Sequence, residues 1–117
     1  MLPLHTSGAG IAFLSACDEA RLAQIAKSDL SGATPFSYTT AEALKAAVKA
    51  AQTLGYAFTE QTFEEDVCGI SVPVFQSDGK LAGTIGVATP LHRMTARSRD
   101  RIVECLKQSA AELSKAL

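Results

Sequence analysis

The chain has 117 residues, 47% of them hydrophobic, so it can bury the core of one domain and is too apolar to be disordered. Eleven lysines and arginines against 12 acidic residues give a net charge of -1, which excludes the strongly basic surface typical of nucleic-acid-binding proteins. No apolar run is long enough to span a bilayer, and we expect no secretory signal at the N-terminus.

The cysteines indicate a reducing environment. Cys17, Cys68 and Cys105 are odd in number, widely spaced and without a Cys-x-x-Cys pair. We therefore expect free thiols in a cytoplasmic protein. Neither of the two histidines is near a cysteine, so the sequence predicts no metal site and no cofactor.

The first half of the chain reads as helices. Residues 11–16 form an apolar run that predicts a short helix, opened by the Gly-x-Gly turn of residues 8–10. Residues 18–27 predict a second helix, with acidic residues in its first turn where the helix dipole favours them. The segment 28–38 contains Gly32 and Pro35 and reads as a loop.

A third helix follows, with start and stop signals. Thr39 and Glu42 have the spacing of a capping box, and Gly55 suits the left-handed position after the last turn. Between these signals, apolar residues recur at helical spacing at Leu44, Val48, Ala51 and Leu54.

Beyond residue 55 the period changes to that of strands. Residues 56–61, 69–75 and 81–88 predict strands, and Asp78-Gly79 predicts a two-residue hairpin turn. A last helix is expected from an N-cap at Thr95, with an apolar stripe at Ile102, Leu106, Ala110, Leu113 and Leu117. The order of elements predicts an α+β domain in which helices cover an antiparallel sheet.

The hairpin turn implies a register in which Ser77 faces Lys80. One face then carries branched residues, in the pairs Ile70–Val87, Val72–Ile85 and Val74–Gly83. The other face carries smaller residues, in the pairs Gly69–Ala88, Ser71–Gly86 and Pro73–Thr84. This face favours two interpretations, a closely packed helix or a ligand cavity beneath the glycine turn.

The glycine turn itself is neither of the well-known phosphate motifs. It lacks the Gly-Lys-Ser/Thr of a P-loop, and no strand or third glycine makes it a dinucleotide fingerprint. The free N–H groups of a helix start still bind anions, and a carboxylate suits them. An ordinary helix start with a close packing contact is the alternative.

No group of residues supports catalysis. The acidic cluster of Glu60, Glu64, Glu65 and Asp66 reads as a solvated loop rather than a catalytic pair. His5 has Ser7 and Ser15 near it but no acid partner at a telling spacing, and nothing nearby activates Cys68.

Three segments together carry a family resemblance. "LPLHTSGAGIAFLS", "TAEALKAAVKAAQTLGYAF" and "GISVPVFQSDGKLAGTIGVATPLHRMT" resemble, in order and spacing, the effector-binding domain of bacterial IclR-type transcription regulators. The resemblance implies a GAF-like α+β fold, a small-molecule effector and a homo-oligomer. It also implies that residues 1–117 are the later part of an effector domain, without the winged helix-turn-helix and the first strands of that family, and that Met1 is internal to a longer protein or begins a shortened one.

The resemblance also implies an effector site. The anion-holding backbone turn of the family falls on Gly8 and Ala9, next to Gly10, and these residues match. The family's polar side-chain positions fall on residues that differ from the family pattern: Thr59, Gly69, Gly86 and Ala88. Ser71 adds a hydroxyl on the same small-residue face.

The expected function is therefore sensing of a small organic acid without chemistry, in a regulator whose full-length form binds DNA. The differing positions predict an acid with a larger apolar body, and a Gly86→Leu substitution is expected to abolish binding while leaving the fold intact. Two alternatives are a truncated oligomerisation module without its own ligand and, with less support, a small enzyme using Cys68 or His5. The strand 81–88 is expected to be an open edge that pairs with another chain.

Overall fold

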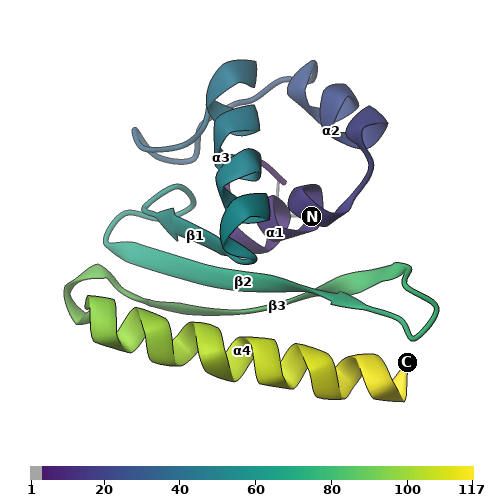
Figure 1. Cartoon of the computed structure of the whole chain (residues 1–117). Coiled ribbons are helices and arrows are strands. Elements are labelled where there is room, and N and C mark those ends of the chain that lie inside the picture. The colour runs from purple at the N-terminus through teal and green to yellow at the C-terminus, as the bar shows by residue number, and fades with distance from the viewer. Residues whose placement is uncertain (1–3) are drawn as a thin grey trace.

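The protein is described by a computed structural model that covers residues 4–117, so Leu2 and Pro3 of the family-like opening segment lie outside it. Three layers make up the molecule (Figure 1). The outer layer consists of α1 (Gly8–Ala16), α2 (Glu19–Ala26) and α3 (Ala41–Leu54). The middle layer is a sheet of β1 (Ala57–Glu60), β2 (Val67–Phe75) and β3 (Leu81–Pro90), and the last layer is α4 (Ala96–Ala116), which follows a short 3₁₀ turn, η1 (Leu91–Arg93). The predicted α+β class is confirmed.

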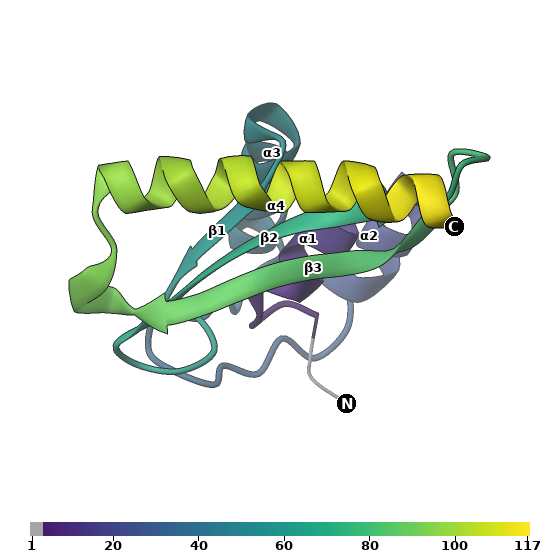
Figure 2. The same cartoon turned by 90° about the horizontal axis from the view of Figure 1, so that it is seen from below.

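The sheet is antiparallel, with the order β1-β2-β3, so β2 is central and β3 forms one edge of the described sheet (Figure 2). All six strand pairs derived from the sequence are present between β2 and β3. On β1, Thr59 pairs with Gly69 and Ala57 with Ser71, which extends the small-residue face across the sheet. The two faces of the hairpin therefore differ as the alternation predicts.

The predicted two-residue turn at Asp78-Gly79 is wrong. Gln76 pairs with Lys80 through a 2.7 Å hydrogen bond from its N–H, so the loop has three residues, 77–79. Gly79 takes the left-handed φ of 89° that such a loop needs at its last position. A bulge between Val74 and Phe75 then shifts the pairing by one residue, which restores the predicted register beyond it.

Two helix starts also differ from expectation. The first helix begins at Gly8 rather than at residue 11, because Ser7 caps it and the glycines form its first turn. In α3 the N-cap is Thr40, whose hydroxyl accepts a 3.1 Å hydrogen bond from the Ala43 N–H, so the capping box predicted at Thr39 and Glu42 is wrong. Gly55 ends this helix with a φ of 82°, as predicted.

The helices α1, α2 and α3 share one apolar core above the sheet. Its largest almost completely buried members are Ile11, Leu14, Leu44 and Val48. Ala57 of β1 belongs to the same cluster, so the core joins these helices to the small-residue face of the sheet.

The branched face of the hairpin packs against α4. Ile70, Val72 and Leu106 form a second buried cluster, with Ile102 and Ala110 against it. The predicted Thr95 cap is confirmed, and Ser98 completes a capping box there. Leu113 and Leu117 are exposed, so only the first part of the predicted apolar stripe is used. In the part of the chain described, no helix has the length and apolar character of a membrane span.

Candidate functional site

A cavity of about 330 Å³ lies between the start of α1, the small-residue face of the sheet and the β1–β2 loop. Seven of the eight site residues expected from the sequence line it; Gly10 does not. The full lining consists of Ser7, Gly8, Ala9, Thr59, Thr62, Phe63, Glu64, Val67, Cys68, Gly69, Ser71, Thr84, Gly86, Val87 and Ala88. The residues assembled here come from four separate stretches of the chain.

The start of α1 supplies unpaired N–H groups to the cavity. The Ser7 hydroxyl accepts a 3.0 Å hydrogen bond from the Gly10 N–H, and the Ile11 N–H donates to the Ser7 carbonyl. The N–H groups of Gly8 and Ala9 have no partner among the described residues. Since the first-turn N–H groups carry the positive end of the helix dipole, this end of the cavity suits an anion.

Two buried hydroxyls lie beside this helix start. Thr59 is 4% exposed and Ser71 is 5% exposed, yet neither hydroxyl has a hydrogen-bond partner within residues 4–117. A Cβ built on Gly8 would lie 3.3 Å from each of the two hydroxyl oxygens. Within the described chain, the one fully enclosed polar side-chain atom without a partner is Arg99 Nε, so both hydroxyl oxygens are still reached from the cavity, where a polar ligand would pair with them.

The small residues allow both a closely packed helix and a ligand cavity, the two interpretations that the sequence left open. Gly69 allows a close approach, because its Cβ would lie 3.0 Å from the Thr59 hydroxyl oxygen and 3.9 Å from the Gly8 Cα. Gly10 has a purely structural place, because a Cβ there would lie 2.1 Å from the Leu4 carbonyl oxygen. Helix α1 thus packs closely on the small-residue face, and the cavity remains beside it.

The expectation that Gly86→Leu leaves the fold intact is wrong. A Cβ at Gly86 would lie 2.2 Å from the Ser71 hydroxyl oxygen and 2.8 Å from the Ile70 carbonyl oxygen. Any side chain at this position would displace Ser71 or push β3 away from β2. The substitution therefore cannot separate ligand binding from folding.

The β1–β2 loop contributes Glu64, which the sequence predicts in a solvated loop, and two residues for which the sequence predicts no role. Thr62, Phe63 and Glu64 line the cavity, although Phe63 is 44% exposed. The loop turns sharply at both ends, where Gln61 and Asp66 have φ values of 62° and 64°. No turn signal in the sequence marks these two left-handed residues, so the sequence predicts only a solvated loop and not its approach to the cavity.

The residues considered for catalysis are not activated. Burial, with a smaller contribution from the Glu60 carboxylate, raises the pKa of the Cys68 thiol, which keeps it protonated and poorly nucleophilic. His5 is buried, and its Nε2 donates a 2.6 Å hydrogen bond to the Ser31 carbonyl oxygen, a structural contact. The described residues contain no group of side chains that could hold a metal ion.

Comparison with known proteins identifies the family of this chain. The family model described as "Bacterial transcriptional regulator IclR C-terminal" matches residues 1–115. The Pca regulon regulatory protein of Pseudomonas putida is 25% identical over 95 residues, which are 80% of this chain and 33% of that protein.

Solved structures show the same fold. The IclR transcriptional regulator of Alicyclobacillus acidocaldarius has a TM-score of 0.91 and 25% identity, over 97% of this chain and 46% of that one. The inducer-binding domain of the PobR transcription factor from Acinetobacter, a double mutant solved with 3-hydroxybenzoic acid, has a TM-score of 0.90 and 23% identity, over 99% of this chain and 67% of that domain.

The chain spans a third of the curated relative and under half of the Alicyclobacillus regulator. The matched family is one of transcriptional regulators and not a class of enzymes. Because the family model covers almost the whole sequence, the chain belongs to the bacterial transcriptional regulator IclR C-terminal family.

Proposed function

We propose that this chain is the ligand-sensing part of an IclR-type regulator and that its cavity binds a small organic acid. The observation that carries the proposal is the group of unpaired donors at one end of the cavity. The N–H groups of Gly8 and Ala9 and the hydroxyls of Thr59 and Ser71 belong to residues that line the same cavity, and none of the four has a partner in the described chain. A carboxylate accepts hydrogen bonds from all four. Binding of the acid would control DNA binding by the full-length, cytoplasmic protein.

The rest of the cavity favours an acid with an apolar body. Phe63, Val67, Val87 and Ala88 line it, and the polar side chains among the sheet residues in its lining are hydroxyls and the protonated Cys68 thiol. A very small and highly polar acid would leave part of this wall uncovered. The PobR domain, which was solved with an aromatic acid, is alike in fold, but the ligand class proposed here depends on the chemistry of this cavity.

The test is a screen of carboxylic acids by thermal unfolding. A ligand present at a hundred times its dissociation constant adds about 2.7 kcal/mol to the free energy of unfolding, which gives a readily measured shift of the midpoint. We expect aromatic and longer-chain monocarboxylates to stabilise the protein more than glyoxylate-sized acids. The reverse preference would contradict the proposed ligand class.

A substitution locates the ligand. Removing the hydroxyl in Ser71→Ala should weaken binding by about tenfold, as expected for one hydrogen bond to a charged group. Ser109→Ala, in an exposed position on α4, is the control and should bind normally. Equal affinities of the two variants would place the ligand elsewhere.

We also infer a homo-oligomer. Strand β3 is ten residues long and forms an edge of the described sheet, with Val87 40% exposed on it. An edge of this length presents unpaired N–H and C=O groups to other chains. The alternative of a module that only associates with other chains makes the same prediction for assembly but predicts no stabilisation by any acid.

A further inference from the structure

The cavity has one charged side chain in its lining. Glu64 is that residue, and no lysine, arginine or histidine lines the cavity within the described chain. The start of α1, on another part of the wall, provides its partial positive charge from the backbone alone. The cavity is therefore polarised, with an anion-binding part at Gly8 and Ala9 and a carboxylate at Glu64.

The loop that carries Glu64 is held in place at its base. The Gln61 N–H donates a 2.8 Å hydrogen bond to the Val67 carbonyl, and the Asp66 N–H donates a 3.1 Å hydrogen bond to the Gln61 side-chain oxygen. These two bonds close the loop between the strands. The two ends of the segment that carries Glu64 are thus held together by hydrogen bonds.

The same loop is tied to the start of α1. Thr62 is buried, and its hydroxyl donates a 2.7 Å hydrogen bond to the carbonyl of Thr6, one residue before the Ser7 cap. The carboxylate and the anion-binding turn are therefore parts of one connected unit. A ligand that reaches from the turn across the cavity meets both.

We propose that Glu64 determines specificity, selecting acids with a single carboxylate and a hydrogen-bond donor or cation at the far end, and rejecting dicarboxylates. This inference depends on the proposed binding of an acid at Gly8 and Ala9. Once the first carboxylate occupies the turn, a hydroxyl or ammonium group near Glu64 is attracted to its carboxylate. A second carboxylate there is repelled by the like charge.

The experiment compares three benzoates whose group opposite the carboxylate is cationic, absent or anionic. The probes are 4-(aminomethyl)benzoate, benzoate and terephthalate, measured by calorimetric titration of the unmodified chain. We expect affinity to fall in that order. Since Glu64 is solvent-exposed, each step is expected to be about two- to fivefold.

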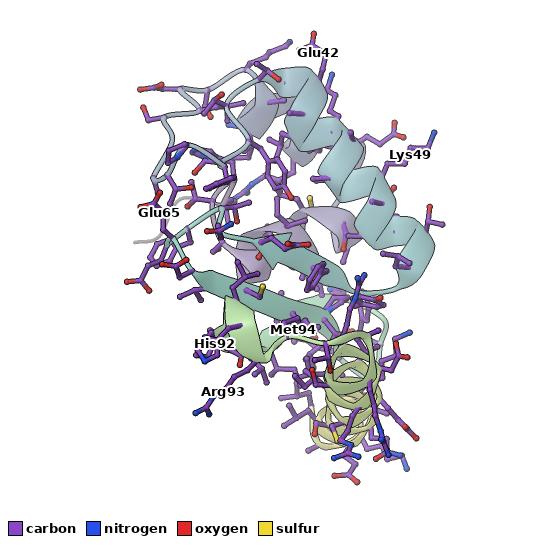
Figure 3. All side chains as sticks on the ribbon, turned by 90° about the vertical axis from the view of Figure 1, so that its left-hand side faces the viewer. Glu42, Lys49, Glu65, His92, Arg93 and Met94 are labelled. Carbon is purple, nitrogen blue, oxygen red and sulfur yellow. The ribbon has the colours of Figure 1, made fainter. Side chains whose placement is uncertain are left out.

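Two glutamine variants separate a local effect from a general one. Glu64→Gln keeps the shape of the side chain and removes its charge, so it should bring the three affinities to within about twofold of each other. Glu65→Gln removes the same charge one residue away, from a side chain that projects into solvent from the end of the molecule and does not line the cavity (Figure 3). It should preserve the order of affinities.

The outcomes are distinct. If benzoate binds but Glu64→Gln leaves the order unchanged, or if Glu65→Gln alters it equally, the role of Glu64 is refuted while the proposed function stands. If none of the three acids binds to the unmodified chain although the thermal screen finds another acid that does, the inference fails while the proposed function stands. If no acid of the screen binds, both fail.

Discussion

Gly86 and Ala88 occupy adjacent positions on the small-residue face of β3 but differ in what they tolerate. Beside Gly86 the Ser71 side chain fills the space where a Cβ would be, so glycine is required for strand pairing. Ala88 already has a Cβ, is exposed and lines the cavity. Bulk can therefore be added at Ala88 without disturbing β2.

This difference gives a test of the cavity at the level of one residue. Ala88→Leu should fill part of the cavity and weaken binding of an aromatic acid by at least about tenfold, a typical effect of overpacking. The thermal midpoint of the ligand-free protein should change little. Thr89→Leu, on the opposite face of the same strand, is the matched control. Normal acid binding by Ala88→Leu in a titration would show that the ligand does not use this cavity.

Residues of the site could be predicted from the sequence where regular helix or strand geometry determines their position. The unpaired N–H groups of Gly8 and Ala9 follow from any helix start, and Ser71 and Ala88 follow from strand alternation. Phe63 and Glu64 could not be predicted, because their position depends on left-handed conformations at Gln61 and Asp66 that L-residues of this kind rarely adopt.

Among the elements, the β2–β3 hairpin shows what a sequence pattern can and cannot specify. The alternation predicted which residues share each face of the hairpin, because a shift by one residue would exchange the two faces, but not which helix covers the branched face. It could not specify the turn, because a three-residue loop with one bulge gives the same register as a two-residue loop. Hydrophobic burial determines which residues share each face of the hairpin, and local backbone conformation determines the length of its loop.

The start of α3 provides a second test at this scale. Thr40→Ala should lower the free energy of unfolding by about 1 kcal/mol, because it removes the hydroxyl that caps the Ala43 N–H. Thr39→Ala, one residue earlier, should change it by less than about 0.5 kcal/mol. Urea unfolding followed by circular dichroism measures both. A larger loss of unfolding free energy in Thr39→Ala than in Thr40→Ala would show that Thr39 caps the helix, in a capping box with Glu42.

For the whole molecule, the open edge at β3 predicts self-association. We expect sedimentation of the chain to show a dimer or larger oligomer at high concentration. Val87→Lys places a charge on the edge strand and should favour the monomer. Leu113→Lys changes a side chain of similar exposure on α4, 42% against 40%, and should leave the assembly unchanged. A stable monomer of the unmodified chain at every concentration would contradict pairing through β3.

The balance of charges leads to a prediction about nucleic acid. With a net charge of -1, the chain should not bind duplex DNA specifically on its own. Four arginines do cluster between residues 93 and 101, but Arg99 stacks on the Phe58 ring, with its guanidinium carbon 4.0 Å from the ring centre. A gel-shift assay at physiological salt tests this prediction, and a complex of nanomolar affinity with one DNA sequence would refute it.

The β1–β2 loop is fastened on its other side to the long connection between α2 and α3. The hydroxyls of Thr34 and Ser37 donate hydrogen bonds to the carbonyls of Gln61 and Thr62, just before Phe63. A bound acid that steadies Phe63 would therefore steady residues 28–38, which do not line the cavity. Slower amide hydrogen exchange in that connection should report occupancy from a distance. Removal of both hydroxyls, in the double variant Thr34→Ala and Ser37→Ala, should uncouple the two segments while leaving the residues that line the cavity unchanged.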